Sequence, residues 1–447
     1  MKVLLLDIYR KDVDYRISKD TNGSYGTGND YGDSLLAKFL KKISKRTNFW
    51  PPLYLMYTGS VLREQGHKVE YINSLERGYD LNSLHSDYDA IIMSSSIVCH
   101  ESEIEVIKNI KDKSKIVVIG SFVTNNPKRY LDQGVKVIKG EPEFYFTDNN
   151  LKDLIKSSEK ELATKNSYLD ELDSLPFPCW DLVDKYLAFS GSIKKRKCIP
   201  IIAERGCPYS CFNYCTYPLE QGRKPRVRSN ENILQEMRYW VEKLNVNEFI
   251  FRDPVFSINR EKTIELADMI IESGIKVKFT IETHLNNLDY ELISKLKEAG
   301  MFFIQCGVES VDEEVMKDAK RFSLEKSAEI EKVNMLRKAG IKVMGMYILG
   351  YESDTRESCL ATINYAKQLN TNIAVFSIFT PYPGTPVYIS FKDKITATRY
   401  EDYNQWNPVF SHKNLTKEEI RKLLTLAFDS YYLNPRWFIR NLLQQLV

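Results

Sequence analysis

Short apolar runs rich in β-branched residues recur through the first 145 residues and alternate with stretches of helical periodicity. Strands that are apolar throughout are buried on both faces, and their alternation with helices is the pattern of a doubly wound parallel sheet. We therefore predict an α/β, Rossmann-like domain over residues 1–150. The predicted strands are 3–7, 67–72, 89–94, 116–120 and 135–138.

The same rhythm restarts after residue 195, with helical patterns such as 232–244 and 327–339 between the apolar runs. Six βα units in series are typical of a partial (β/α)6 barrel, whose chemistry lies at the carboxyl ends of its strands. We predict this barrel over residues 196–395. The predicted strands are 199–204, 248–253, 277–282, 302–307, 343–349 and 373–380.

A polar stretch, 157–173, separates the two regions and ends at Leu175-Pro176-Phe177-Pro178. Proline excludes both a helix interior and a central strand, so we predict a linker over 151–195.

The last predicted region, 396–447, is helical. Thr416 and Glu419 form a capping box at the start of a helix, and the helical pattern resumes after Pro435. The apolar end around Trp437, Phe438 and Ile439 can touch a membrane or a partner, and we expect it to pack back on the barrel.

A glycine-rich insertion, Ser18 to Gly32, follows the first predicted strand directly. We expect a flexible loop over the carboxyl ends of the strands, which is where open α/β sheets bind ligands. An ordinary surface loop is the alternative.

Charge and composition narrow the class of protein. Lys plus Arg number 63 and Asp plus Glu 60, a net charge of +3, which argues against a nucleic-acid partner. No run approaches the ~18 apolar residues of a membrane helix. The run Val3 to Leu6 is broken by Asp7 and is too short for a signal peptide. We expect a soluble, cytoplasmic protein with no membrane partner.

Cys207, Cys211 and Cys215 lie within nine residues, directly after the first predicted barrel strand. Pro208 disfavours a regular helix there, so a loop is expected. Three thiolates on a four-iron cluster leave one iron open, as a catalytic centre requires. A structural zinc site is the alternative and would need a remote fourth ligand such as His284 or Cys306.

Arg-Gly-Cys-Pro-Tyr-Ser-Cys, residues 205–211, resembles the cluster loop of the radical S-adenosylmethionine (SAM) superfamily, particularly members with an N-terminal cobalamin-binding-type (B12-binding-like) domain. The usual spacing is CxxxCxxC, whereas CxxxCxxxC here resembles the radical SAM diol-dehydratase of the apramycin pathway. The resemblance implies a [4Fe-4S] cluster that cleaves SAM to a 5′-deoxyadenosyl radical, which abstracts hydrogen from a small-molecule substrate. It also implies an electron donor such as flavodoxin or ferredoxin.

Further motifs follow the second, fourth, fifth and sixth predicted strands, in the order that the superfamily has them. The resemblance implies that Tyr214 packs against the adenine of SAM, that Asp253 belongs to the second-strand motif and that Glu309 reaches SAM. The matching segments are 251–259, 306–310, 345–350 and 381–386.

Gly120 and the segment Gly140-Glu141-Pro142-Glu143 resemble the loops of cobalamin-binding-type domains, which makes Gly120, Gly140 and Glu141 candidate cofactor-binding residues. The DxHxxG motif that supplies a lower histidine ligand is missing after the first strand. His100 is the nearest candidate in a strand-end loop. Many radical SAM relatives bind cobalamin without that histidine, so its absence does not exclude the cofactor. We favour a domain that keeps the fold and has lost cobalamin, with cobalamin binding as the alternative.

Glu282 and His284 are two residues apart at the end of the third barrel strand, hence on one side of it. We predict them as the general acid and base, with a structural ion pair as the alternative. The predicted reaction is hydrogen abstraction, including lyase-type dehydration of a sugar or aminosugar diol. The alternatives are a cobalamin-dependent methyltransferase and a non-catalytic metal-binding regulator.

Overall fold

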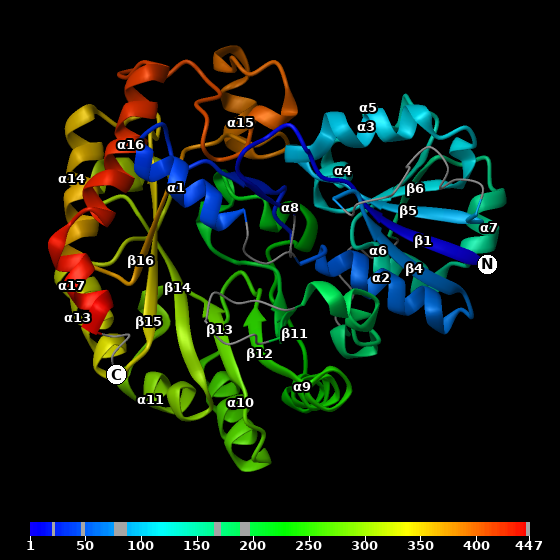
Figure 1. The fold of residues 1–447 in the computed structure, drawn as a ribbon, viewed down its shortest axis with the longest axis horizontal. Coiled ribbons are helices and arrows are strands. Elements are labelled where there is room, and N and C mark those ends of the chain that lie inside the picture. The colour runs from blue at the N-terminus through cyan, green and yellow to red at the C-terminus, as the bar shows by residue number, and fades with distance from the viewer. Residues whose placement is uncertain (20–22, 46–49, 76–86, 165–170, 188–196, 444–447) are drawn as a thin grey trace.

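The computed structural model describes residues 1–19, 23–45, 50–75, 87–164, 171–187 and 197–443. Two α/β units lie side by side (Figure 1), and each is built on a six-stranded parallel sheet. The predicted fold class, a Rossmann-like sheet followed by a partial barrel and C-terminal helices, is confirmed.

The first sheet has the strand order β4-β1-β5-β6-β7-β8. The order reverses between β1 and β5, so their carboxyl ends form the switch point at which such sheets bind ligands. Apolar side chains bury both faces of β1, as predicted. The strands are β1 (Lys2–Asp7), β4 (Lys68–Asn73), β5 (Ala90–Ser94), β6 (Ile116–Ile119), β7 (Lys136–Lys139) and β8 (Glu161–Ala163). The helices around it are α2 (Leu53–Glu64), α3 (His100–Asn109), α4 (Ser121–Asn125), α5 (Lys128–Leu131), α6 (Pro142–Asp148) and α7 (Leu151–Lys156).

Two predictions about this unit need correction. The sheet continues into the segment predicted as a linker, because β8 pairs with β7 and buries Leu162. The glycine-rich insertion is not simply a loop, because β2 (Arg16–Ser18) and β3 (Thr27–Asn29) pair antiparallel within it. A single buried position in a three-residue strand is too weak a pattern to recognise in sequence.

The second sheet has the order β16-β15-β14-β13-β12-β9 and forms an open half-barrel. Its strands coincide with the predicted runs to within a few residues: β9 (Lys197–Ile201), β12 (Val246–Phe251), β13 (Lys278–Glu282), β14 (Met301–Glu309), β15 (Lys342–Leu349) and β16 (Ile373–Ile378). A short ribbon, β10 (Glu204–Arg205) and β11 (Arg226–Val227), precedes and follows the cysteine loop. The helices are α8 (Tyr217–Gln221), α9 (Asn230–Leu244), α10 (Arg260–Ser273), α11 (Tyr290–Glu298), α12 (Glu313–Asp318), α13 (Lys326–Lys338), α14 (Arg356–Leu369) and α15 (Pro386–Ser390).

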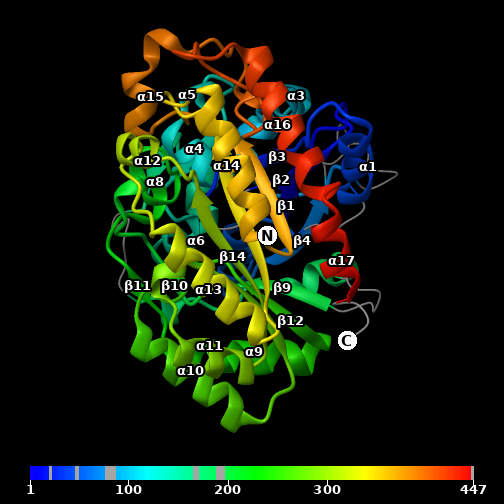
Figure 2. The ribbon, with the colours of Figure 1, turned by 90° about the vertical axis from the view of Figure 1, so that its left-hand side faces the viewer.

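The C-terminal helices α16 (Lys417–Tyr432) and α17 (Pro435–Leu443) cover the outer side of the barrel beside α1 (Leu35–Ser44), as Figures 1 and 2 show. The predicted capping box of Thr416 and Glu419 is present. Trp437 packs back as expected and donates through Nε1 to the carbonyl of Asn372 at 2.9 Å. Within the described part of the chain, no helix combines the length and the apolar character needed to cross a membrane.

Candidate functional site

The cysteine loop leaves the barrel between β10 and α8. Cys211 lies in a single 3-10 turn, Ser210–Asn213, and its carbonyl accepts from the backbone N–H of Cys215 at 3.1 Å. Gly206 has φ +87°, and a Cβ on it would stand 2.3 Å from the carbonyl of Lys224. Only glycine fits this position.

The three thiols of the loop are free, and each lies near enough to another to affect its pKa. Burial raises the pKa of Cys207 to about 11. In the described residues, no three Cys, His, Asp or Glu side chains have the spacing of a single-ion site. Four-iron clusters bind each thiolate to a different iron, so their ligands stand further apart than those of one zinc ion. The donor set fits a cluster.

Arg321, which the sequence analysis did not identify, completes this side of the site. Its Nη1 donates to Cys211 Sγ at 3.7 Å, and its Nη2 lies 3.5 Å from Glu309 Oε1. Arg321 comes from the loop after α12, where nothing in the local pattern distinguishes it from a surface arginine.

Glu309 ends β14 in a strained conformation, with φ +66° beside an irregularity in the pairing with β15. Such a conformation is rare for a residue with a side chain and is concentrated at functional sites. Burial raises the pKa of the Glu309 carboxyl. The bend turns this carboxyl towards Arg321 and the cysteine loop.

Tyr214 lies in an aromatic group at the same end of the barrel. Its ring contacts the edges of Tyr351 and Phe379, with centroids 5.9 and 5.7 Å apart. An aromatic face beside the third cysteine is compatible with stacking on a purine, which stays a prediction.

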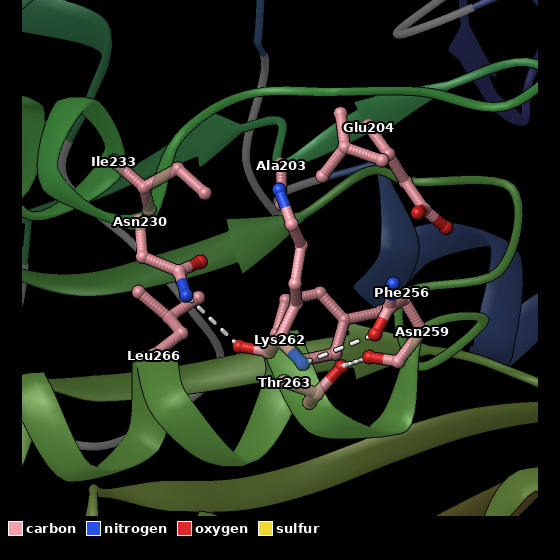
Figure 3. A pocket seen from close by; sticks show the side chains of 10 residues that line it. Ala203, Glu204, Asn230, Ile233, Phe256, Asn259, Lys262, Thr263 and Leu266 are labelled. Atoms are coloured by element: carbon pink, nitrogen blue, oxygen red, sulfur yellow. Dashed lines mark hydrogen bonds between the residues drawn. The ribbon is translucent and has the colours of Figure 1, made fainter.

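Asp253, at the end of β12, accepts from the backbone N–H groups of Ala203 and Glu204. It thereby fixes the exit of the chain into the cysteine loop. Burial raises the pKa of Asp253 to about 7, and burial together with Asp253 raises that of Glu204 to about 10. Glu204 lines a small cavity between α9 and α10 (Figure 3), of about 20 Å³. That space holds about one water molecule.

Glu282 and His284 have separate partners. Glu282 Oε2 lies 3.5 Å from Arg252 Nη1. His284 accepts from the N–H of Asn286 through Nδ1, and its Nε2 is 3.4 Å from the carbonyl of Phe322. Burial lowers the pKa of His284 to about 4, so the ring is neutral at pH 7 and carries its proton on Nε2. Both side chains remain at the carboxyl end of β13, and their acid–base role stays a prediction.

Glu141 joins the two units. Its carboxylate accepts from Arg205 at 2.6 Å and from Arg226 at 2.8 Å, and Glu143 lies 2.5 Å from Arg205. All four side chains are buried. Arg205 and Arg226 are cross-strand partners in the β10–β11 ribbon, and Gly206 and Cys207 follow Arg205 directly. The predicted cofactor residue Glu141 therefore holds the cluster loop against the first sheet.

Gly120 and Gly140 leave little open space. A Cβ on Gly120 would stand 2.3 Å from the hydroxyl of Tyr54, and one on Gly140 would stand 3.3 Å from Oγ1 of Thr164. Packing and a φ of +115° require glycine at position 120, and a φ of +87° favours it at position 140.

Lys19 fills the switch point of the first sheet. Its ammonium lies 3.0 Å from Asp7, 2.8 Å from Glu103 and 2.9 Å from Ser94 Oγ, with the lysine side chain fully buried. Asp7 and Ser94 are the last residues of β1 and β5, where a ligand of this fold would enter. The ammonium of Lys19 therefore neutralises the carboxylates at this switch point.

His100 is also closed off. Its ring meets the edges of Phe122, Tyr130 and Tyr400 at centroid distances of 5.5, 4.9 and 5.0 Å. Burial, followed by the charge of Arg129, lowers the pKa of His100 to about 4. His100 is thus a buried ring surrounded by three aromatic side chains, and it is neutral at pH 7.

Residues 201–366, which contain all of these barrel residues, match the Radical SAM superfamily. They form a radical SAM domain. An uncharacterized methyltransferase of Pyrococcus horikoshii is 27% identical over 88% of this chain and 90% of its own. The solved structure of the cobalamin-dependent SAM radical enzyme OxsB, with aqua-cobalamin and SAM bound, covers 98% of this chain and 70% of its own at 14% identity, with a TM-score of 0.69. The radical SAM methyltransferase TsrM from Kitasatospora setae covers 88% and 76% at 15% identity, with a TM-score of 0.63.

These matches confirm the resemblance on which the sequence analysis relied. Residues 201–366 are a radical SAM domain, and the chain shares its overall fold with solved structures of cobalamin-dependent SAM radical enzymes. The relatives include methyltransferases and an anaerobic magnesium-protoporphyrin IX monomethyl ester cyclase, and they favour the alternative, methyl transfer, over dehydration.

Proposed function

We propose that this radical SAM enzyme is of the methyltransferase type and acts on a small-molecule substrate. The observation that carries the proposal is the 27% identity with the uncharacterized methyltransferase of Pyrococcus horikoshii over 88% of the chain, a share that is too large for the barrel alone. A match to the barrel alone would not distinguish methyl transfer from any other radical reaction. The cysteine spacing favoured dehydration over methyl transfer, and this proposal reverses that ranking.

Cys207, Cys211 and Cys215 would hold the cluster, and Glu309 with Arg321 would orient SAM beside it. A four-iron cluster held by these thiolates would supply the open iron for SAM and the electron for its cleavage, and an external donor such as flavodoxin or ferredoxin would supply that electron. Arg321 lies 3.7 Å from Cys211 Sγ and stabilises negative charge there. The strained backbone of Glu309 fixes its carboxyl before the ligand arrives.

A substrate proton would be handled at the end of β13. Because His284 is neutral, its Nδ1 accepts a proton once the hydrogen bond from Asn286 is released. Glu282 lies 3.5 Å from Arg252, and burial raises the pKa of its carboxyl, as is common for groups that transfer protons.

The decisive experiment measures the products of SAM after anaerobic reconstitution with iron and sulfide. With hydroxocobalamin and a low-potential reductant, we expect S-adenosylhomocysteine, and none when cobalamin is omitted. Cobalt that stays with the protein through gel filtration is the second expected result. Cys211→Ala protein, treated identically, is the control for SAM breakdown that does not need the cluster.

Hydrogen abstraction without methyl transfer is the second candidate, favoured by the burial of Lys19 at the switch point. It gives 5′-deoxyadenosine without S-adenosylhomocysteine and no retained cobalt. That result would overturn the methyltransferase proposal and leave the cluster site intact.

A further inference from the structure

The outer face of α1 is apolar and exposed. Leu35, Phe39 and Ile43 are 84%, 59% and 46% exposed. With 3.6 residues per turn they lie in one stripe along the helix, whereas Leu40 faces the core. We call these three residues the α1 stripe. Large apolar side chains aligned in this way on a solvent face mark an interaction site.

Positive charge lies directly beside the α1 stripe. Lys38 and Lys42 are exposed one quarter-turn away, and α1 contains no acidic residue. Lys41 is paired with Asp30, and Lys45 donates to the carbonyl of Val13. Asp14 is the only acidic residue among those that line the shallow depression between these lysines.

The face continues onto the C-terminal helices. Ser34, which caps α1, donates to Asp429 of α16 at 2.6 Å. Leu426 and Leu433 are seven residues apart, which is about two helical turns, so they lie on the same side of the end of α16. Both are exposed. On α17, Phe438 and Ile439 are exposed beside Arg436, and this helix too has no acidic residue. Figures 1 and 2 both show α1 beside α16.

We propose that this face, the α1 stripe with Lys38 and Lys42 and the exposed apolar end of α17, docks on the surface of an anionic lipid bilayer. An aromatic and aliphatic stripe beside exposed lysines, on a helix that itself contains no acidic residue, is the pattern of helices that lie in a membrane interface. The lysines match lipid phosphates, and the stripe enters the boundary between headgroups and acyl chains.

The proposal goes beyond the proposed reaction and replaces the sequence-based expectation of no membrane partner. Its test is flotation of the full-length protein, reconstituted with its cluster, on vesicles of phosphatidylcholine with and without phosphatidylglycerol. We expect binding to the anionic vesicles only, weakening as salt is raised. Lys38→Gln/Lys42→Gln should weaken binding about thirtyfold, since each lysine near an anionic surface contributes about a factor of five.

Leu35→Ser/Phe39→Ser/Ile43→Ser should weaken vesicle binding at least about a hundredfold while SAM cleavage is retained. Tyr290→Ser/Ile389→Ser and Lys108→Gln/Lys317→Gln change exposed residues elsewhere and should bind as the unmodified protein does. Equal binding to neutral vesicles, no binding to either kind, or equal losses in the control variants would overturn the proposal. So would loss of a dimer in the α1 variant, which would assign the face to a second copy, or binding of flavodoxin but not of vesicles.

Discussion

The carboxyl edges of the two sheets differ in what occupies them. At the barrel edge, three free thiols, Arg321 and the strained Glu309 converge from separate loops. At the edge of the first sheet, the ammonium of Lys19 satisfies the carboxylates at the switch point, and Tyr54 fills the space over Gly120. The barrel edge presents free thiols, whereas the charges at the edge of the first sheet are neutralised within the chain.

This contrast shows why the rule that ligands bind at the carboxyl ends of parallel strands is more informative for the barrel than for the first sheet. Ligands of parallel sheets do bind at carboxyl ends, yet the fold alone does not say whether the chain fills that place itself. The Glu141–Arg205 pair further shows that the first unit has a second use, which is to hold the cluster loop.

The barrel edge is tested most severely by removing a thiol. Cys207→Ala, Cys211→Ala and Cys215→Ala should each abolish reductive cleavage of SAM, because two thiolates cannot hold the site-differentiated cluster. Iron and sulfide analysis should fall from about four of each per chain. Retained cleavage in any one variant would show that its cysteine is not a ligand, and zinc without sulfide would restore the structural-zinc interpretation.

Glu141→Gln tests the link between the two edges. Breaking a buried ion pair costs about 3–5 kcal/mol, so the free energy of unfolding should fall by that order in denaturant titrations. Glu236→Gln is the matched control, because it breaks the buried Arg228–Glu236 pair within the barrel unit, 2.6 Å long. Both variants should lose stability, and only Glu141→Gln should also lower the iron bound after reconstitution. Equal iron in the two would reduce Glu141 to a purely structural role.

Lys19→Met tests whether the ammonium of Lys19 neutralises the buried carboxylates at the carboxyl edge of the first sheet. Removing the ammonium leaves Asp7 and Glu103 buried and unpaired, which should again cost about 3–5 kcal/mol at pH 7. Because the orphaned carboxyls can regain stability by binding protons, the loss should shrink as the pH is lowered towards 5. Lys41→Met, which breaks the more exposed pair with Asp30, serves as the control. A loss that does not depend on pH would mean that the two carboxylates are not held by Lys19.

Glu309→Ala affects ligand binding without removing a cluster ligand. A carboxylate hydrogen bond to a charged or polar group contributes roughly 1.5–3 kcal/mol, so the affinity for SAM should fall about tenfold or more. Calorimetry on reconstituted protein measures it, with iron content as the check that the cluster is intact. Unchanged affinity would place Glu309 outside the SAM site.

The regular parts of this molecule were predictable because their signals are local. Apolar strands and the cysteine spacing are visible in a few residues, so eleven predicted strands and the three cysteines appear where expected. Arg321 and the pairing of Glu141 with Arg205 were not predictable, since each depends on residues that are 64 or more positions apart in the chain. β8 was not predictable for a related reason. It forms by pairing with β7, and one buried side chain is its only sign in the sequence.

The last prediction concerns His100 in the first unit, which is a buried histidine with a lowered pKa, like His284 in the barrel. Its replacement has the smallest expected effect on stability at neutral pH. Its folded pKa of about 4 lies below the ordinary value of 6.5, so between these values the unfolded chain binds a proton that the folded chain does not. Stability therefore falls as the pH drops through 6.5, by up to about 1.4 kcal/mol per pH unit. His100→Phe keeps a flat ring in the aromatic box and removes this proton, so the change at pH 7.5 should stay below about 1.5 kcal/mol. Denaturant titrations from pH 7.5 to 4.5 should then show a flatter acid-side decline for the variant. Parallel profiles would mean that water reaches His100, and the ring would again become a candidate ligand at the first edge.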